Sequence, residues 1–441
     1  MHSFHRGIHL NPVRVGICGL GTVGSGTVNV LTRNAQEISA RAGTGIIIEQ
    51  IGARRDNPAC DTSGFNVTRD IFEVVRNPNV DVVVELIGGT TVAKELVEEA
   101  LANGKHVVTA NKALIAHYGN ELFARAKEAG VTIAFEAAVA GGIPIIKALR
   151  EGLAANKIKW LAGIINGTGN FILTEMRDKG RDFDDVLKEA QALGYAEADP
   201  TFDVEGIDAA HKLVILASLA FGMPLQFDKV FTEGISRIEP VDVAYAGELG
   251  YRIKHLGIAR RTNGGVELRV HPTLIPEKRL LANVDGVMNA VVVKGDAVGP
   301  TLYYGPGAGA EPTASAVVAD IVDIARELGT GQAVCVPPLG FNEAQEWPVL
   351  PMDEVETAYY LRISALDQPG VLSKIAQILS DAGISIEALI QKEAPEEQVH
   401  VPMILLTNRT IEKKVMNAVT AIESLGYVLG EVVHIRVETL S

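Results

Sequence analysis

The first third of the chain alternates between short apolar runs and longer stretches of helical periodicity. The apolar runs have the length and the β-branched content of buried strands, and we expect strands at 13–19, 45–53, 80–87, 105–109 and 131–139. Helical patterns separate these runs, with helices expected to reach about residues 42 and 103. Strands that alternate with helices predict a parallel sheet with helices on its faces, so we assign the α/β class.

After Pro144 the strict alternation ends and the pattern becomes mixed. The segment 207–221 is apolar at most positions and predicts a largely buried helix, and further strands are expected within 266–293. A strongly periodic helix follows, which Thr313 or Ser315 is suited to start. The middle of the chain therefore predicts an α+β domain that supplies a substrate wall and a subunit interface.

A proline-rich connection at 330–354 without sustained periodicity marks a domain boundary. Beyond it we expect a strand at 358–365, a helix at 371–382, strands at 384–391 and 399–407, and then a helix and a strand. This order of elements is ferredoxin-like.

Length and composition describe an ordinary globular chain. The 441 residues exceed what one core usually holds, so two or three domains are expected. A net charge of −14 argues against nucleic acid or an anionic membrane as the partner, because both attract basic surfaces. The three cysteines lie far apart without metal-ligand spacing, and no apolar run reaches the ~18–20 residues of a membrane span. We expect a cytoplasmic protein that binds small molecules, and we assign no function to residues 1–10.

A glycine-rich turn separates the first strand from the first helix. It reads Gly19-Leu-Gly21-Thr22-Val23-Gly24, which is the GxGxxG pattern. Glycines allow a tight turn and the close approach of a pyrophosphate, whose charge is met by amide donors at the helix N-terminus. The alternative is a turn that is merely tightly packed. Because further strands and helices follow, we expect a dinucleotide site at these residues.

The second strand ends in Arg54 and Arg55 instead of the acidic residue that binds a ribose 2′-hydroxyl. Arginines suit a 2′-phosphate, so we expect NADP to be preferred over NAD. Two observations leave NAD open: arginines after a strand are often only solvated, and Asp56 lies next to this pair.

Carboxylates are concentrated in the stretch 194–212, just before and within the apolar helix. Asp208 and Lys212 are four residues apart and share one face of that helix. An ordinary surface ion pair has the same spacing. The apolar flanks favour a buried lysine beside a carboxylate, which is an arrangement suited to proton transfer.

The same stretch resembles homoserine dehydrogenase, and the resemblance extends from residue 13 to the C-terminal tail. Its signature matches Ala190, Gly194, Tyr195, Asp199, Pro200, Asp203, Val204, Gly206, Asp208 and Lys212. The resemblance implies that Lys212 is the acid/base group, that Asp208 is its catalytic partner, and that Glu197 binds the substrate amino group. Asp203 is implied as a second substrate-binding carboxylate. The implied reaction is the reversible, NAD(P)H-dependent reduction of L-aspartate 4-semialdehyde to L-homoserine.

Further roles follow from the resemblance alone. Lys112, in the run Thr109-Ala-Asn-Lys112, is implied to lie by the nicotinamide and the substrate, with a catalytic part. Thr168 and Gly309 are implied as cofactor contacts, although Gly309 also suits a close-packed turn. A sodium or potassium ion is implied at Glu136, Val139, Gly141 and Ile143, where the residues themselves indicate only a tight turn.

The tail resembles an ACT domain through the sequence LDQPGVL and the later GISIE. This implies feedback regulation by an amino acid, with L-threonine as the expected effector near Asp367, Gly370 and Ile384. The alternative is a dimerisation module without a ligand. A homodimer or homotetramer is expected in either case.

These observations divide the chain into four parts. We expect a Rossmann-type nucleotide-binding domain at 11–143 plus 305–335, a substrate-binding and dimerisation domain at 144–304, a linker at 336–355, and a ferredoxin-like ACT domain at 356–441.

Two rival functions remain at this point. One is another ACT-tailed NAD(P) oxidoreductase, such as a hydroxyacid dehydrogenase, but its His/Glu pair has no evident counterpart at the strand ends. The other is an amino-acid sensor that binds nucleotide without catalysis, which has no need for the spacing of Asp208 and Lys212.

Overall fold

The computed structural model describes residues 11–330, 336–392 and 400–441, and the chain folds into two compact units. The first unit is built from Met1–Ile158, His211–Asp228 and Val293–Glu346, and the second from Lys159–Ala210, Lys229–Val292 and Trp347–Ser441. Three expectations concern positions outside the described residues: the leader at 1–10, the end of the nucleotide domain at 331–335, and the first residue of the strand at 399–407.

The first unit contains a six-stranded sheet in the order β3-β2-β1-β4-β5-β6, and its neighbouring strands pair in parallel. The strands are β1 (Val13–Cys18), β2 (Ile46–Gly52), β3 (Val67–Thr68), β4 (Val82–Glu85), β5 (His106–Thr109) and β6 (Ile133–Ala134). Their side chains are mostly buried, as expected for parallel strands covered on both faces. The expected α/β class is confirmed.

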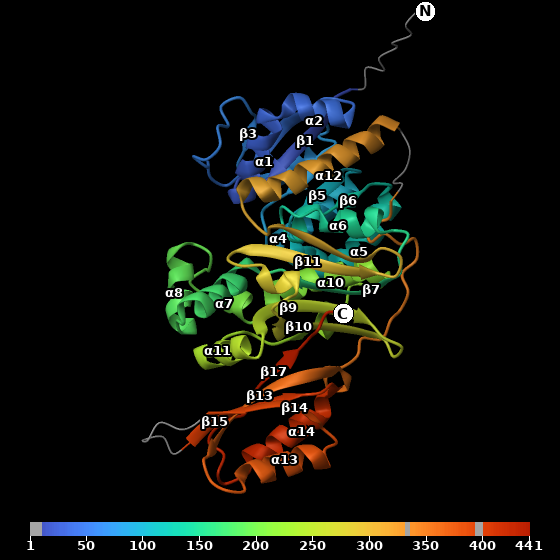
Figure 1. Cartoon of the computed structure of the whole chain (residues 1–441). Helices are drawn as coiled ribbons and strands as arrows, with labels where there is room; N and C mark the ends of the chain where they lie inside the picture. Colours follow the sequence, from blue (N-terminus) through green and yellow to red (C-terminus); the bar gives the residue numbers. More distant parts are fainter. Residues whose placement is uncertain (1–10, 331–335, 393–399) are drawn as a thin grey trace, which may run out of the picture. The chain divides into compact units, whose positions relative to one another are not determined.

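Helices cover both faces of this sheet (Figure 1). Val15 and Ile17 of β1 face a core that includes residues of α1 and α12, whereas a Cβ on Gly16 between them would meet Val74 of α3 at 2.4 Å. The bounds are α1 (Thr22–Arg33), α2 (Ala35–Ala42), α3 (Ile71–Arg76), α4 (Val92–Ala102), α5 (Lys112–Ala129) and α12 (Ala310–Thr330). The chain therefore returns to the nucleotide-type sheet through α12, which begins at Ala310, before Thr313.

Three expectations for this unit were wrong in detail. The helix expected to run to residue 42 breaks at Asn34, which separates α1 from α2. The strand expected at 80–87 shortens to β4. The strand expected at 131–139 ends at Ala134, because Glu136–Ala138 forms a 3₁₀ turn in which the Glu136 amide donates to Asp320 on α12 (2.8 Å). A long-range side-chain partner thus overrides the local strand preference.

Several short elements and one long helix also lie wholly or partly in the first unit. They are α6 (Ile145–Lys147), a π-helical turn (Ala148–Gly152), α10 (Ile207–Phe221), a 3₁₀ turn (Phe227–Lys229), β11 (Met288–Gly295) and β12 (Gly299–Pro306). Residues 214–221 of α10 are almost completely buried, as its apolar sequence predicts.

The second unit contains a mixed sheet that includes the strand order β7-β9-β10-β17-β13-β15-β14. Its first part has β7 (Ile158–Ile164), β8 (Phe231–Thr232), β9 (Tyr251–Arg261) and β10 (Val266–Pro276) with α7 (Gly167–Lys179), α8 (Phe183–Ala192), α9 (Thr201–Val204), α11 (Pro240–Glu248) and a 3₁₀ turn (Leu280–Asn283). Helices α7 and α11 pack on β9. This is the expected α+β arrangement.

The C-terminal module has the expected ferredoxin-like order. It consists of a 3₁₀ turn (Met352–Glu354), β13 (Glu356–Leu366), α13 (Val371–Asp381), β14 (Ile386–Gln391), β15 (His400–Thr407), β16 (Thr410–Ile411), α14 (Glu412–Glu423) and β17 (Val433–Val437). The last strand, β17, pairs antiparallel with β13 and parallel with β10. The module is therefore joined to the rest of the second unit through one continuous sheet.

A buried ion network secures this junction. Arg269 on β10 is 1% exposed and pairs with Glu267 and with Glu438, just beyond β17, and Arg260 pairs with Glu438 at 2.8 Å. Burial alone would raise the pKa of Glu438, but the charges of Arg269 and Arg260 hold it down at about 2. Glu438 is therefore ionised and paired across the physiological pH range.

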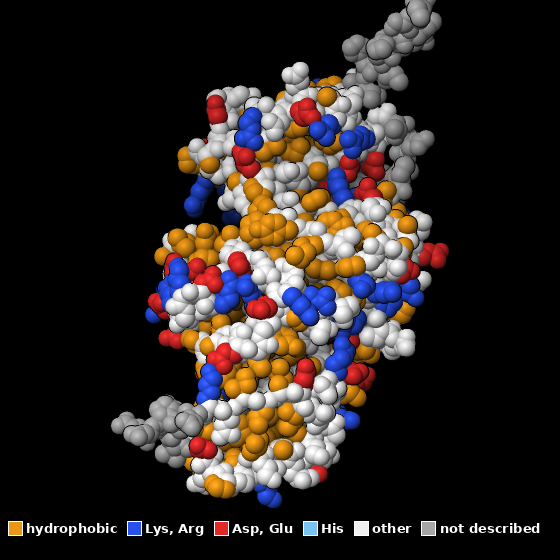
Figure 2. All heavy atoms as spheres, viewed as in Figure 1, with side chains coloured by type: hydrophobic (Ala, Val, Ile, Leu, Met, Phe, Trp, Pro, Cys, Tyr) orange, Lys and Arg blue, Asp and Glu red, His pale blue; other side chains and the backbone are white. Residues whose placement is uncertain are grey.

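The surface carries mixed charges. On the face shown in Figure 2, Lys and Arg side chains are interspersed with Asp and Glu and do not form one continuous basic field. Within the described part of the chain, no helix is both long and apolar enough to cross a membrane.

Candidate active site

The glycine turn connects β1 to α1, and its three glycines have different surroundings. Gly19 has φ +106°, and a Cβ there would lie 2.5 Å from the Leu86 carbonyl oxygen, while a Cβ on Gly24 would lie 2.1 Å from the Gly19 carbonyl oxygen. Gly21 is the N-cap of α1, and a Cβ on it would meet no atom of the chain within 4 Å. The first and third glycines are thus required for packing, whereas the second leaves space beside the helix N-terminus, where Thr22 and Val23 begin α1.

Arg54 and Arg55 lie exposed directly after β2. Their acidic neighbour Asp56 pairs with Arg69 at 2.8 Å, and Arg69 also donates to the carbonyl of Ala53. Arg69 therefore neutralises Asp56, and the site at this strand end keeps its positive charge. Sequence reasoning missed Arg69, which carries no local motif.

A fully buried carboxylate organises the ends of β4 and β5. Glu85 accepts hydrogen bonds from Thr109 (2.5 Å) and from the amides of Ile87 and Gly88, and burial raises its pKa. Asn111 donates to the Gly89 carbonyl at 2.6 Å. These bonds fix two loops at the carboxyl edge of the parallel sheet, where ligands bind in open α/β folds.

Lys112 is placed by the second of these loops. The side chain of Asn111 accepts from the amide of Leu114 at 3.0 Å and so caps α5, which makes Lys112 the first residue of that helix. The sequence predicted that Lys112 lies where a strand ends and a helix begins. It did not indicate Glu85, because the hydrogen-bond partners of Glu85 are the side chain of Thr109, 24 residues away, and backbone amides.

In the second unit, one amide side chain joins two of the expected site carboxylates. Asn166 donates to Asp203 and to Asp208, both at 2.8 Å, and its oxygen accepts from the Gly169 amide at the start of α7. Both donor hydrogens and the acceptor of Asn166 are therefore used. Asn166 was not among the predicted site residues, although an asparagine before a small-residue helix start is a known capping signal.

Asp208 and Lys212 lie one turn apart on α10 and are 4% and 9% exposed. This burial excludes the alternative of a solvated surface ion pair. The neighbouring His211 stacks on Phe227 (ring centroids 4.3 Å apart), and its Nε2 lies 3.1 Å from Nε2 of His117 on α5. The contacts of His211 fix the rotation of α10 within the first unit.

Two other predicted residues, Thr168 and Glu197, are associated with the loop that contains Tyr195. Thr168, in the first turn of α7, donates its hydroxyl to the Tyr195 carbonyl at 2.6 Å. Gln191 donates to the carbonyl of Glu197, whose side chain is exposed on the same loop. Thr168 thus supports the Glu197 loop, while Glu197 lies outside the Asn166 cluster.

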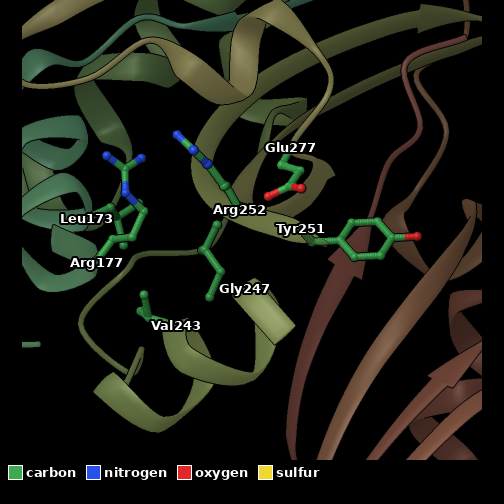
Figure 3. Close-up of a pocket in the computed structure, with 8 residues that line it drawn as sticks. Leu173, Arg177, Val243, Gly247, Tyr251, Arg252 and Glu277 are labelled. Atoms are coloured by element: carbon green, nitrogen blue, oxygen red, sulfur yellow. The ribbon is translucent and has the colours of Figure 1, made fainter. Parts of the chain in front are cut away.

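The far end of α7 is anchored by charge. Asp285 binds Arg177 (2.8 Å) and the buried Lys254 (3.0 Å), whose pKa burial lowers to about 8. Figure 3 shows the side chains of Arg177 and Arg252 extending to the same side, whereas Tyr251 extends in another direction, and all three residues line a cavity of about 190 Å³. Because Asn166 caps the other end of α7, these contacts help to fix the carboxylate cluster.

The loop after β6 holds the expected cation ligands. Glu136 is 2% exposed and accepts from the amides of Ile146 (2.9 Å) and Lys147 (2.8 Å). Burial and the charge of Asp320 raise the pKa of Glu136 to about 7. Ala140 and Gly141 have φ of 54° and 35°, so the backbone turns sharply between Val139 and Ile143. Gly309, with φ +123°, begins the approach to α12.

Comparison with protein families finds three matching regions. The family model for homoserine dehydrogenase matches residues 144–322, its NAD-binding domain matches 19–136, and the ACT domain matches 359–424. A homoserine dehydrogenase of Pseudomonas aeruginosa is 67% identical over 434 residues, covering 98% of this chain and 100% of the relative. The chain belongs to the homoserine dehydrogenase family. It is an oxidoreductase with an NAD-binding domain and an ACT domain.

Solved structures of homoserine dehydrogenases agree with this assignment. The enzyme from Thiobacillus denitrificans is 61% identical with a TM-score of 0.93, and the match covers 98% of this chain and 99% of that one. A hyperthermophilic archaeal homoserine dehydrogenase in complex with NADPH is 28% identical with a TM-score of 0.61, and the match covers 73% and 99%. The family resemblance stated from the sequence is confirmed.

Proposed function

We propose that this homoserine dehydrogenase catalyses the reversible reduction of L-aspartate 4-semialdehyde to L-homoserine with NADP(H) preferred, in the cytoplasmic synthesis of threonine, methionine and isoleucine. The observation that carries the catalytic assignment is the burial of Asp208 and Lys212 on one turn of α10. Family membership supports the substrate.

The protein side chains handle the substrate and its proton. The Lys212 ammonium donates a proton to the forming alkoxide in reduction and accepts it in oxidation, and Asp208 orients that ammonium. Glu197 binds the substrate ammonium, Asp203 is a second substrate-binding carboxylate, and Lys112 is placed for the substrate and the nicotinamide. The nicotinamide, when bound, supplies or accepts the hydride.

An assay of the reaction in the reductive direction tests this proposal directly. Incubation of the enzyme with L-aspartate 4-semialdehyde and NADPH should consume one equivalent of NADPH per molecule of L-homoserine, identified by chromatography. NADPH consumption with a product other than L-homoserine would contradict the substrate assignment.

For the cofactor, we assign the pyrophosphate to the turn Gly19–Gly24 and the N-terminus of α1 in the first unit. We assign further contacts to Lys112 and Gly309 in the same unit and to Thr168 in the second unit. The NADPH found in the archaeal relative supports this choice of nucleotide.

Gly21→Ala is expected to raise the KM for NADP at least tenfold and to leave the thermal midpoint unchanged. The added methyl meets no chain atom within 4 Å, so it blocks only the approach of the pyrophosphate. Cofactor titration and thermal denaturation check both parts. An unchanged KM would place the pyrophosphate elsewhere, and Gly24→Ala serves as the contrast because its methyl meets the Gly19 carbonyl and destabilises the turn.

Arg54→Ala is expected to raise the KM for NADP by about 10- to 150-fold and to leave the KM for NAD nearly unchanged, because one charge-assisted hydrogen bond is worth about 1.5–3 kcal/mol. Initial rates with both cofactors measure the ratio. Arg41→Ala, at an exposed position on α2, is the matched control. Equal effects on the two cofactors would contradict a role for Arg54 at the 2′-phosphate.

The loop at Glu136 fits a monovalent cation. A buried carboxylate with a raised pKa lies shortly before a sharp turn, and we assign the main-chain oxygens of Val139, Gly141 and Ile143 as the other ligands. Hard cations of this kind bind oxygen ligands. We propose that sodium or potassium is held there and orders this loop.

The cation is expected to change the pH dependence of stability. In the folded chain the pKa of Glu136 is raised from 4.5 to about 7. Between these two pH values the folded state binds a proton that the unfolded state does not bind, so stability falls as the pH rises from 4.5 to about 7. A bound cation stabilises the ionised form. At pH 8, K⁺ or Na⁺ should therefore raise the thermal midpoint above that in tetramethylammonium at equal ionic strength.

Two variants complete this measurement. Glu136→Gln should remove the cation dependence, and Glu151→Gln, at an exposed position, should keep it. Equal midpoints of the native enzyme in all three salts would exclude a cation at this loop.

The ACT module offers a cleft for the expected effector. A cavity of about 340 Å³ is lined by residues of the turn 366–372, including Asp367 and Gly370, and by Gln391 and Met403. Ile384 is buried in the module core and does not line this cavity. We propose feedback by L-threonine at this turn in a homodimer or homotetramer.

A further inference from the structure

The order of the strands in the first sheet has a reversal point. From β1 the chain adds β2 and β3 on one side, and then β4, β5 and β6 on the other, so the order reverses between β1 and β4. In open parallel sheets, ligands bind at this point, beyond the carboxyl ends of the strands. The two segments that follow these strands are residues 19–24 and 86–89, which we call the switch-point loops.

The switch-point loops are packed together, and the second one has open backbone. The amide of Leu86 donates to the carbonyl of Cys18 at 2.8 Å, and a Cβ on Gly19 would lie 2.5 Å from the Leu86 carbonyl oxygen. Gly88 and Gly89 have φ of +72° and +74°, and a Cβ on either would meet no atom of the chain within 4 Å. This loop therefore leaves its backbone accessible to a ligand.

Two separate sets of hydrogen bonds hold the loop 86–89. Glu85 accepts from the amides of Ile87 (2.9 Å) and Gly88 (3.1 Å), and these bonds fix the loop to the end of β4. Asn111 donates its side-chain amide to the carbonyl of Gly89 at 2.6 Å, although the two residues are 22 positions apart. The second bond joins the loop to the start of α5.

Asn111 is itself held on several sides. It is 8% exposed, its side-chain oxygen accepts from the Leu114 amide at 3.0 Å, and its own amide donates to the Thr109 hydroxyl at 3.0 Å. That hydroxyl donates to the buried Glu85 at 2.5 Å. Lys112 is the next residue and begins α5. A shift of the Lys112 backbone relative to the loop would break at least one of these bonds.

Helix capping alone does not explain an asparagine at position 111. Asparagine, aspartate and serine are about equally good N-caps, because each offers an oxygen to the helix amides. Asp70 caps α3 in this way and accepts from the Phe72 amide at 2.9 Å. Of the three, asparagine alone can accept with one side-chain atom and donate to a distant carbonyl with another. The bond from Asn111 to Gly89 is therefore additional to the cap.

We propose that Asn111 is a positioning residue for the reaction, because its bond to Gly89 fixes the base of Lys112 against the loop 86–89. A displacement of about 1 Å at a reacting centre costs about 10²-fold in rate, so one such bond matters to turnover. The part that Lys112 takes in turnover rests on the proposed function. The bond that joins Asn111 to the loop does not.

Asn111→Ser removes this bond and keeps the cap, because serine is too short to reach the Gly89 carbonyl. We expect kcat/KM for homoserine to fall by about 10- to 100-fold, with a higher KM for homoserine. The KM for NADP and the thermal midpoint should stay nearly unchanged, because Glu85 still holds the loop. Unchanged kcat/KM would overturn the proposal. Equal increases in the KM for NADP and for homoserine would show a general loosening and would also overturn it.

Two further variants control for the cap and for folding. Asp70→Ser exchanges the exposed cap of α3 and should keep native kinetics. Asn111→Asp keeps the cap and the shape of the side chain but replaces the donor with an oxygen, so it should repeat the loss even if the serine variant does not fold. Native kinetics in folded Asn111→Asp would overturn the proposal.

Binding provides a readout without turnover. NADPH and L-homoserine are both in the reduced state and do not react with each other, so calorimetry of L-homoserine on the NADPH-loaded enzyme measures affinity alone. This affinity should be lower in Asn111→Ser than in the native enzyme and unchanged in Asp70→Ser. Equal affinity in all three proteins would contradict the positioning of Lys112 by Asn111.

A double-mutant cycle tests whether Asn111 acts through Lys112. If it does, Asn111→Ser added to Lys112→Met should cause no further loss of kcat/KM. Losses that multiply in the double variant would show independent roles and overturn the proposal. Native turnover in Lys112→Met would remove Lys112 from the reaction and overturn both this proposal and its proposed role. A loss in Lys112→Met with native turnover in Asn111→Ser would overturn this proposal alone.

Discussion

Lys212→Met is expected to lower kcat for homoserine oxidation by about 10²- to 10⁴-fold, the usual contribution of a positioned general acid or base. Lys212 is 9% exposed on a helix whose following residues are buried. Methionine keeps the length and apolar packing of the lysine stem, so the helix should retain its place. The substitution therefore removes only the proton-transfer group. Discontinuous assays at saturating homoserine and NADP measure the decrease in kcat.

Two measurements separate this effect from misfolding. The thermal midpoint and the Kd for NADPH of Lys212→Met should match those of the native enzyme. Lys188→Met, at an exposed position on α8, should retain native turnover. Near-native kcat in Lys212→Met would remove Lys212 from the mechanism, and the acid/base assignment would fail.

Glu438→Ala is expected to destabilise the second unit by about 3–5 kcal/mol, the cost of breaking a buried ion pair by removing one partner. The substitution leaves Arg269, which is 1% exposed, without one of its two carboxylates. The loss should appear as a lower urea midpoint for the β-sheet signal. Arg269→Met combined with Glu438→Leu should recover much of it, because the remaining charges, Arg260 and Glu267, lie 3.8 Å apart and still pair with each other.

The pH dependence of the same interaction provides a second measure. The folded-state pKa of Glu438 is about 2, below its ordinary value of 4.5. Its contribution is therefore complete above pH 4.5 and is lost as pH falls toward 2. Glu431→Ala, at a residue whose side chain is 84% exposed, should have little effect. An equal loss in both variants would contradict the buried-network explanation.

The sequence predicted the fold where apolar periodicity determines it. Parallel strands buried on both faces read as apolar runs, so β1, β2, β4 and β5 were found with errors of a few residues. The ferredoxin-like order was also readable. The pairing of β17 with β10 was not, because the partners are separated by more than 150 residues and no local pattern encodes their register.

The candidate site, like the fold, could be predicted only in part. Four-residue spacing and apolar flanks were sufficient to predict Asp208 and Lys212 on one face of a buried helix. Asn166 and Glu85 were missed because their roles depend on hydrogen bonds to residues distant in the chain. The remaining roles, including the cation ligands and Glu197 as a substrate contact, come from family resemblance and stay predictions.

The most direct test of the central claim is homoserine-dependent reduction of NADP and of NAD, followed by nicotinamide absorbance in basic buffer, because oxidation of the alcohol releases a proton. The account predicts steady reduction that requires L-homoserine, is faster with NADP at low cofactor concentration, and rises with pH. Folded, nucleotide-binding protein that reduces neither cofactor would contradict the account and favour an amino-acid sensor.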